Sequence, residues 1–251
     1  SIASTVANNS VKAFIDSSIV NSTTGNVQVT ANVLPPATPS DFTAQGLSDD
    51  DLPDEVDLGA QIISVAVAGS GSLAGGAAAG SISRNLMKNS VESYISGDSS
   101  RVEAAGDVDV KALDQSTVIS VALGLSGASS NAGGVAISHN YIGGNNFDLS
   151  PYLTSTFLSS GLLGLDTLVP DRGYVRAYIE GATVDAAGDV SVLAHGASIL
   201  TNVSIGGAGA GANAVGGSIA VNFIRNDITA DIRNGADVDA DGKLDLVALS
   251  T

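Results

Sequence analysis

An internal repeat constrains this chain more than any other feature of its sequence. A nine-residue block that begins Ser-Ile-Ala and ends in Asn occupies residues 1–9. Closely similar blocks occupy residues 81–89 and 218–226, and a fourth copy begins at Ala136 and is interrupted after Ile142. Because units that recur along a chain usually pack against their own copies, the repeat predicts a stacked architecture.

The segments that follow each block alternate apolar and polar residues. The first alternating segments are residues 11–15, 91–95, 175–179 and 228–232. The second segments, each opened by Gly, are residues 25–29, 106–110, 188–192 and 242–246. A third strand is expected around residues 65–67, 121–123 and 203–205. Period-two alternation with glycine punctuation is typical of β-strands, so the sequence predicts an all-β fold.

The spacing between copies indicates two insertions. Ile82 and Ile137 are 55 residues apart, whereas the other neighbouring copies are 80 and 82 apart. A unit of about 53 residues therefore carries insertions at approximately residues 33–57 and 143–171. Because they leave the repeat register intact, both are predicted to be loops, the second with a short amphipathic helix over residues 152–169.

Stacked units of this kind predict a parallel β-solenoid, with backbone hydrogen bonds running along the stack. Small residues suit a thin interior, and the whole chain, residues 1–251, is expected to be one solenoid segment of a longer array. If one unit forms each level of the stack, Phe14, Tyr94 and Tyr178 occupy one outward position. The sequence therefore predicts an aromatic ladder of these three rings.

Charge and composition exclude several classes of function. The formal net charge is -16, with only 10 Lys and Arg residues, so no basic surface for nucleic acid is expected. Cysteine is absent, which excludes disulfides and thiolate metal sites. Residues 59–83 carry no charge, but their polar interruptions and period-two alternation argue against a membrane-spanning helix. We therefore expect no membrane span in this segment.

Two acidic clusters are candidate calcium sites. The first lies in the earlier insertion and comprises Asp49, Asp50, Asp51, Asp54, Glu55 and Asp57. Crowded carboxylates either stay solvated or bind a hard cation. The second comprises Asp237, Asp239 and Asp241, which match the first half of an EF-hand loop but have Ala248 where a bidentate Glu is needed. A solvated repeat turn is the alternative reading of residues 237–241.

Nothing in the sequence supports catalysis. The chain has two histidines, His139 and His195, and neither belongs to a metal-binding spacing. Asp107, Asp189 and Asp245 recur with the repeat, as structural positions do. Gly-rich strings such as residues 69–72 lack the strand-to-helix context of a nucleophile elbow. We therefore expect a protein that is not an enzyme and has no cofactor other than calcium.

The pattern ATVDAAGDVSVLA at residues 182–194, together with SIAVNFIRN at 218–226, resembles repeats of giant secreted bacterial adhesins of the filamentous-haemagglutinin-like and leukotoxin-like kinds. The resemblance implies a right-handed parallel β-helix that is secreted or at the bacterial cell surface. It transfers no catalytic residue.

The function expected from the repeat and the resemblance is that of a non-catalytic structural stalk segment in an adhesin. Its partners would be neighbouring repeats of the same chain and a host or cell-surface glycan or protein. Two alternatives stay open: a carbohydrate-binding or carbohydrate-cleaving β-helix, and a self-assembling sheath or filament module.

Overall fold

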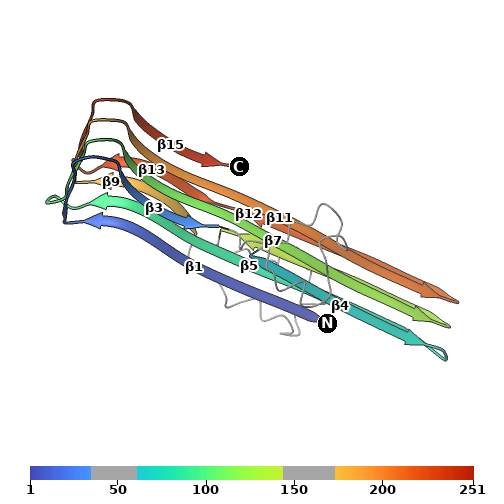
Figure 1. Ribbon diagram of the computed structural model, residues 1–251. Helices are drawn as coiled ribbons and strands as arrows, with labels where there is room; N and C mark the ends of the chain where they lie inside the picture. The colour runs from blue at the N-terminus through green and yellow to red at the C-terminus, as the bar shows by residue number, and fades with distance from the viewer. Residues whose placement is uncertain (35–60, 144–172) are drawn as a thin grey trace.

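The computed structural model describes residues 1–34, 61–143 and 173–251 (Figure 1). These residues form parallel β-sheets with no helix among them, as the alternating segments predict. None of the described segments is a helix long and apolar enough to cross a membrane. The predicted all-β class is therefore confirmed.

The strands form three sheets. Sheet A comprises β1 (Ile2–Asp16), β5 (Ala77–Ser96), β8 (Asn131–Ile142), β9 (Tyr174–Glu180), β12 (Asn213–Ile224) and β13 (Asp227–Arg233). Sheet B comprises β2 (Ile19–Ser22), β6 (Arg101–Ala104), β10 (Thr183–Ala186) and β14 (Asp237–Ala240). Sheet C comprises β3 (Val27–Val33), β4 (Ile62–Ser72), β7 (Val108–Ala128), β11 (Val190–Ala210) and β15 (Leu244–Ser250).

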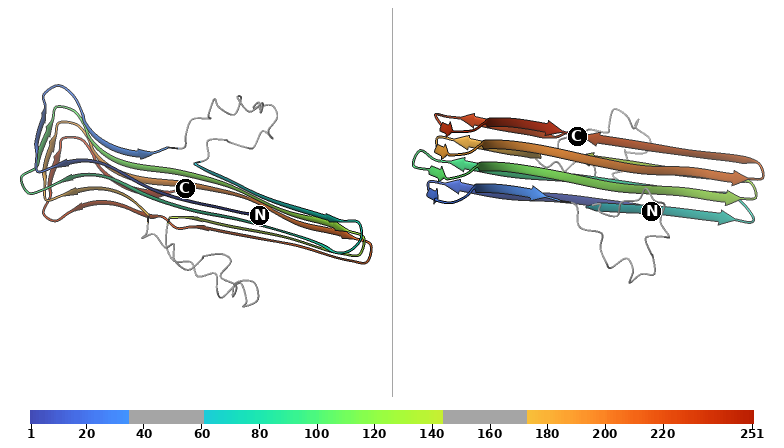
Figure 2. Two further views of the ribbon diagram at one scale, coloured as in Figure 1. Left: turned by 90° about the horizontal axis from the view of Figure 1, so that it is seen from below. Right: turned by 45° about the horizontal axis from the view of Figure 1, so that its top comes forward.

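The chain passes through these sheets at four successive levels, which the right-hand view of Figure 2 shows one above another. Level 1 contains β1–β4, level 2 β5–β7, level 3 β8–β11 and level 4 β12–β15. Equivalent residues of the repeat pair directly between levels: Ile82 pairs with Ile2 on one side and with Ile137 on the other. One repeat unit therefore forms each level, as predicted.

The strands are longer than the sequence pattern suggests. The predicted segments 81–89 and 91–95 are both parts of β5, and segments 106–110 and 121–123 overlap or lie within β7. The stretch interpreted as a repeat turn, residues 237–241, contributes instead the strand β14 to a third sheet. It is a strand because Val238 continues an inward row that contains the buried Val102 and Val184. Alternation within only four residues was too short a signal to separate a strand from a turn.

The two insertions interrupt long strands of opposite sheets. Pairing to β7 ends at Val33 and resumes at Ile62, so β3 and β4 together match one uninterrupted strand. In the same way β8 ends at Ile142 and β9 begins at Tyr174, alongside the continuous β5. The predicted helix at residues 152–169 lies outside the described residues.

The three sheets enclose an apolar core at one end of the molecule, here called the three-sheet end (residues 11–33, 90–114, 174–196 and 227–250). Rows of Val, Ile and Ala point inward, and Val91, Val102 and Val108 are fully buried within them. Because the same residue type repeats at each level, every inward side chain packs on its own counterpart above and below.

Beyond the end of sheet B, sheets A and C pack directly against each other. This two-sheet slab comprises residues 61–87, 115–142 and 197–224, and it forms the narrow end of the outline in the left view of Figure 2. Its interior is thin because glycines allow the sheets to touch: a Cβ on Gly124 would lie 2.1 Å from the backbone oxygen of Val135. The small residues of the predicted third strands therefore mark where two sheets approach closely.

The interior of the slab is lined with hydroxyl groups. Ser83 Oγ lies 2.8 Å from both Ser64 Oγ and Ser120 Oγ, and Ser120 Oγ lies 2.6 Å from Ser138 Oγ. All four serines are buried. The slab is thus joined across its interior by a chain of hydrogen bonds, with a small apolar cluster of Ile62, Met87, Val118 and Ile142 where it meets the three-sheet end, whereas the three-sheet end is held by a larger apolar core.

Candidate functional site

The outward face of sheet A at the three-sheet end carries the densest group of aromatic and charged side chains in the described residues. The predicted aromatic ladder is present: the Phe14 and Tyr94 ring centroids are 5.2 Å apart, and those of Tyr94 and Tyr178 are 4.9 Å apart. In both pairs the ring planes are nearly parallel and stacked, and all three residues are in register between levels. The prediction of one repeat unit per level is confirmed by this spacing.

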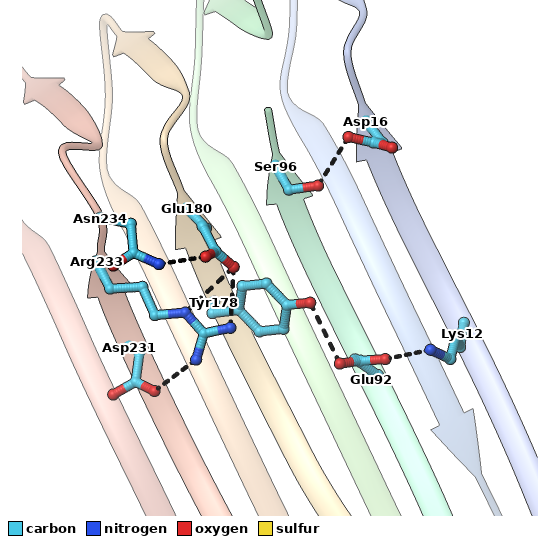
Figure 3. A network of polar contacts seen from close by, with 9 residues as sticks. All are labelled: Lys12, Asp16, Glu92, Ser96, Tyr178, Glu180, Asp231, Arg233 and Asn234. Carbon is cyan, nitrogen blue, oxygen red and sulfur yellow. Dashed lines mark hydrogen bonds and ion pairs between the residues drawn. The ribbon is translucent and has the colours of Figure 1, made fainter. Parts of the chain in front are cut away.

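Level 4 has Asp231 at the ladder position, and an arginine takes over the contact with the last ring. Arg233 Cζ lies 4.2 Å from the Tyr178 ring centroid. The same guanidinium group pairs with Glu180 at 3.0 Å and with Asp231 at 3.5 Å (Figure 3). Asn234 also donates a hydrogen bond to Glu180. These two donors, Asn234 first and then Arg233, lower the pKa of the Glu180 carboxyl.

A second group of polar contacts joins levels 1, 2 and 3 on the same face. Lys12 Nζ lies 2.6 Å from Glu92 Oε2, and the Tyr178 hydroxyl donates to Glu92 Oε1 at 3.2 Å (Figure 3). The hydrogen bond to Glu92 raises the pKa of Lys12, while burial and the neighbouring Glu92 raise that of Tyr178. Both donors therefore stay protonated at neutral pH.

Alignment of the repeat copies also places Lys12, Glu92 and Arg176 in one row, for which the sequence predicts contacts between charges of alternating sign. In the structure this row forms one close pair. Lys12 binds Glu92 as above, whereas Arg176 lies over the Tyr174 ring, 4.4 Å from its centroid, and 3.7 Å from Asp227. The charged row therefore makes one contact between its own members on neighbouring levels, whereas the aromatic ladder beside it makes two.

This geometry favours a structural role over a chemical one. Glu92 is 8% exposed, and its carboxylate already forms an ion pair with Lys12 and accepts a hydrogen bond from Tyr178, so both of its oxygens have partners within the protein. The faces of Tyr94 are covered by Phe14 and Tyr178, so that ring presents only its edge to a ligand. Sugar rings stack on aromatic faces, and among the described residues the ladder leaves an uncovered face at Phe14, which is 56% exposed. The contacts of this face chiefly tie one level to the next.

The predicted calcium ligands are not brought together in the described residues. Asp237 and Asp239 lie on β14 and Asp241 follows it. Among residues 1–34, 61–143 and 173–251, no group of three or more His, Cys, Asp or Glu side chains is placed to hold a metal ion. The other six candidates, Asp49, Asp50, Asp51, Asp54, Glu55 and Asp57, lie outside these ranges.

Recurring carboxylates form a structural column that sequence reasoning recognised only in part. Asp107 Oδ1 accepts a hydrogen bond from the backbone N–H of Asp189 at 2.9 Å, and Asp189 Oδ1 accepts one from Lys243 N at 2.8 Å. Asn26 Oδ1 accepts from Asp107 N in the same way. Asp245, which was grouped with Asp107 and Asp189, pairs with Ser191 and belongs to a different row. The signal for the column is the Gly-Asp or Gly-Asn dipeptide.

Two buried titratable groups lie near the points where the insertions leave the sheets. Asp114 accepts hydrogen bonds from Asn89 at 2.7 Å and from Ser116 at 3.0 Å, and burial raises the pKa of its carboxyl. His139 is a register neighbour of Arg84 on the outward face of sheet A. Burial, and then the charge of Arg84, lowers the pKa of His139 to about 4. The imidazole is therefore neutral at physiological pH.

Comparison of the chain with protein-family models, with curated proteins and with solved structures finds no match in any of the three. The class of the protein is thus defined by its architecture: an all-β chain whose repeats stack as parallel strands at successive levels.

Proposed function

We propose that this chain is a non-catalytic segment of a parallel β-solenoid that serves as a stiff stalk in a secreted or cell-surface protein. The observation that carries the proposal is the unbroken register of equivalent residues between levels. A rod of this kind transmits force through backbone hydrogen bonds along its whole length, and its stiffness is independent of any ligand.

The first and last levels present complementary residues, which supports the idea of an extendable rod. In the register of the stack, Arg233 of a last level would stand beside Asp16 of a first level. Asn226 would stand beside Asn9, and Asp239 beside Asn21. Pairs of these kinds already occur inside the chain, where Asn9 donates to Asn89 and Asn21 donates to Glu103. A further unit can therefore add to either end with the same contacts.

The rival carbohydrate-binding function receives less support from the site. Such a function needs exposed ring faces and free carboxylates, but the rings of the ladder stack on one another, and Glu92 and Glu180 pair with basic side chains (Figure 3). Capture of a glycan that is lost in Phe14→Ala, the variant that removes the ladder's free face, would favour the rival.

The test is a tandem protein in which two copies are joined in register. Ser250 pairs with Gly196, so Thr251 is equivalent to residue 197, and Ser1 is equivalent to Ser218. An additional copy of residues 198–217, inserted between Thr251 of the first copy and Ser1 of the second, therefore supplies the strands missing at the junction. We expect a single folded rod, longer by four levels or about 19 Å, in small-angle scattering. We also expect one cooperative transition at a higher Tm than that of the single copy.

The control changes only the junction. Arg233→Glu in the first copy places like charges beside Asp16 of the second copy and should reduce the gain in Tm, while Asp16→Lys in the second copy should restore it. The same substitutions in the single copy supply the baseline. Two independent transitions at the single-copy Tm, with scattering of two flexibly linked bodies, would reject the proposal.

A further inference from the structure

The slab differs from the rest of the molecule in its lack of charge. Its ranges, residues 61–87, 115–142 and 197–224, contain one residue of the types Asp, Glu, Lys and Arg, namely Arg84 in sheet A. The chain as a whole has 36 such residues, since it holds 10 basic and 26 acidic ones. Sheet C contributes none of them to the slab.

The slab has mostly small or polar side chains inside and apolar side chains outside. Most inward positions of sheet C are small or polar, such as the buried Ser64, Ser120 and Ala122, whereas Ile62 and Val118, next to the three-sheet end, join a small apolar cluster with Met87 and Ile142. The alternate, outward positions include Ile, Val and Leu at three successive levels, and the most exposed of these are Ile63, Val65, Val67, Leu125, Ile199, Val203 and Ile205, at 41–59%. Folded proteins in water normally place these residue types the other way round. A contiguous apolar patch of this kind marks an interaction surface.

A lipid environment suits this face less well than protein does. Within the slab, sheet C consists of β4, β7 and β11, so β4 and residues 197–210 of β11 are open edges in the described chain. Open sheet edges in hydrocarbon leave backbone groups without hydrogen-bond partners, which is strongly unfavourable. A partner that covers only the face leaves these edges in water or against further levels of the stack.

A second copy of the chain fits the face by spacing and by charge. Its rows repeat at the same inter-strand distance of about 4.8 Å, so the ridges of one sheet match the grooves of the other. Face-to-face contact here also brings no carboxylates together, although each copy carries a net charge of -16. The charged three-sheet ends remain in solvent.

We propose that the outward face of sheet C in the slab binds the same face of a second copy of this chain. This lateral pairing goes beyond the proposed stalk function, which needs only contacts along the stack. The 11 residues of β4 span about 36 Å and three strands span about 14 Å, so the pair buries about 1,000 Å² in total. That area is at the lower limit for a specific interface, so a single segment forms a weak dimer and longer arrays pair more tightly.

Sedimentation velocity of the 251-residue chain over a wide concentration range tests this pairing. We expect a reversible monomer–dimer equilibrium that Val65→Lys/Val67→Lys weakens at least tenfold, because each lysine would be buried without a partner. The matched control is Val135→Lys/Val215→Lys, which places the same charges on the outward face of sheet A and should leave the dimer intact. Circular dichroism checks that both variants fold.

Site-specific cross-linking provides a second readout, because the chain has no cysteine. Val121→Cys, at the centre of the face, should give covalent dimers with a short bis-maleimide, and Val215→Cys should not. A chain that stays monomeric at all concentrations overturns the proposal, as does a dimer unaffected by Val65→Lys/Val67→Lys. A dimer abolished by Arg233→Glu alone would indicate end-to-end stacking, and binding to phosphatidylcholine vesicles without dimer formation would indicate lipid; either result also overturns it.

Discussion

A glycine precedes the recurring Asp or Asn of the carboxylate column because the Asn or Asp side chain of the preceding level occupies the space that a Cβ would need. A Cβ on Gly106 would lie 2.1 Å from Asn26 Oδ1, and one on Gly188 would lie 2.2 Å from Asp107 Oδ1. Each glycine therefore accommodates the side chain of the level before it, and that side chain accepts the backbone N–H of the residue after the glycine. The Gly-Asp or Gly-Asn dipeptide therefore joins one level to the next, and its role is apparent only when two neighbouring levels are considered together.

Replacement of Gly188 by alanine should destabilise the fold. The new methyl group would displace the Asp107 carboxylate and break its hydrogen bond to Asp189 N, at a cost of about 1–3 kcal/mol in the free energy of unfolding. Gly25 occupies the same column at level 1 and has nothing within 4 Å, so Gly25→Ala is the matched control and should change stability by less than about 0.5 kcal/mol. Urea unfolding measures both. Equal effects of the two substitutions would contradict this account.

The low pKa of His139 predicts a loss of stability in acid. The folded-state pKa is about 4, below the ordinary value of 6.5, so the unfolded chain binds a proton in a range where the folded chain does not. Stability is therefore full above about pH 6.5 and falls as the pH decreases towards 4, by at most about 3 kcal/mol. His139→Gln should remove this part of the pH dependence in denaturant unfolding.

The control for that experiment is His195→Gln, because His195 lies elsewhere, on β11, beside Thr251 Oγ1. Its profile between neutral pH and about pH 4 should remain that of the unmodified protein. An unchanged acid slope in His139→Gln would show that other groups cause the loss.

At the scale of the element, the long strands are continuous wherever no insertion interrupts them. Gly173 N donates to Gly143 O at 2.9 Å, so the two ends of the second insertion lie side by side in sheet A. In level 2 only two residues, Lys88 and Asn89, separate the equivalent positions Met87 and Ser90. The interruption of the strand therefore needs no more than two residues to close.

Deletion of residues 143–171 should leave the stack intact. The product joins Ile142 to Arg172 and places two residues before Tyr174, the same spacing that level 4 has between Ile224 and Asp227. We expect a soluble protein with a β-sheet circular dichroism spectrum and cooperative unfolding. Deletion of residues 85–88 from the uninterrupted β5 is the negative control, because it removes paired strand residues and should abolish folding. An insoluble product from the first deletion would show that the insertion belongs to the core.

At the scale of the whole molecule, the two ends differ in the side chains of their interiors and exteriors, although the same parallel strand pairing runs through both. The three-sheet end has an apolar interior and a charged exterior, and the slab has an interior of mostly small and hydroxyl side chains and an apolar exterior. Because successive levels repeat this division, the contrast runs along the stack. Stacking and lateral association thus use separate surfaces, the strand edges for one and the face of sheet C for the other.

The sequence alone predicted the strand class, the alignment of repeats, one unit per level and the aromatic ladder at Phe14, Tyr94 and Tyr178. These features follow from patterns of period two and from copies aligned by counting, and such patterns are local. Of the candidate site, it predicted the ladder and the Lys12–Glu92 contact, but not the capping of Tyr178 by Arg233, since Arg233 comes from another row.

Only the tertiary structure decided that neighbouring predicted segments join into single strands, that residues 237–240 form a strand of a third sheet, and that sheets A and C touch through Gly124 and Gly134. Each of these depends on what lies on the facing sheet or on the next level, typically some 80 residues away in the chain. A local pattern fixes which side of a strand is apolar, but whether that side meets a second sheet or solvent is set by the packing of one sheet against another. In the slab that packing reverses the usual choice, because the narrow gap between the sheets admits only glycine, alanine, serine and asparagine along most of its length.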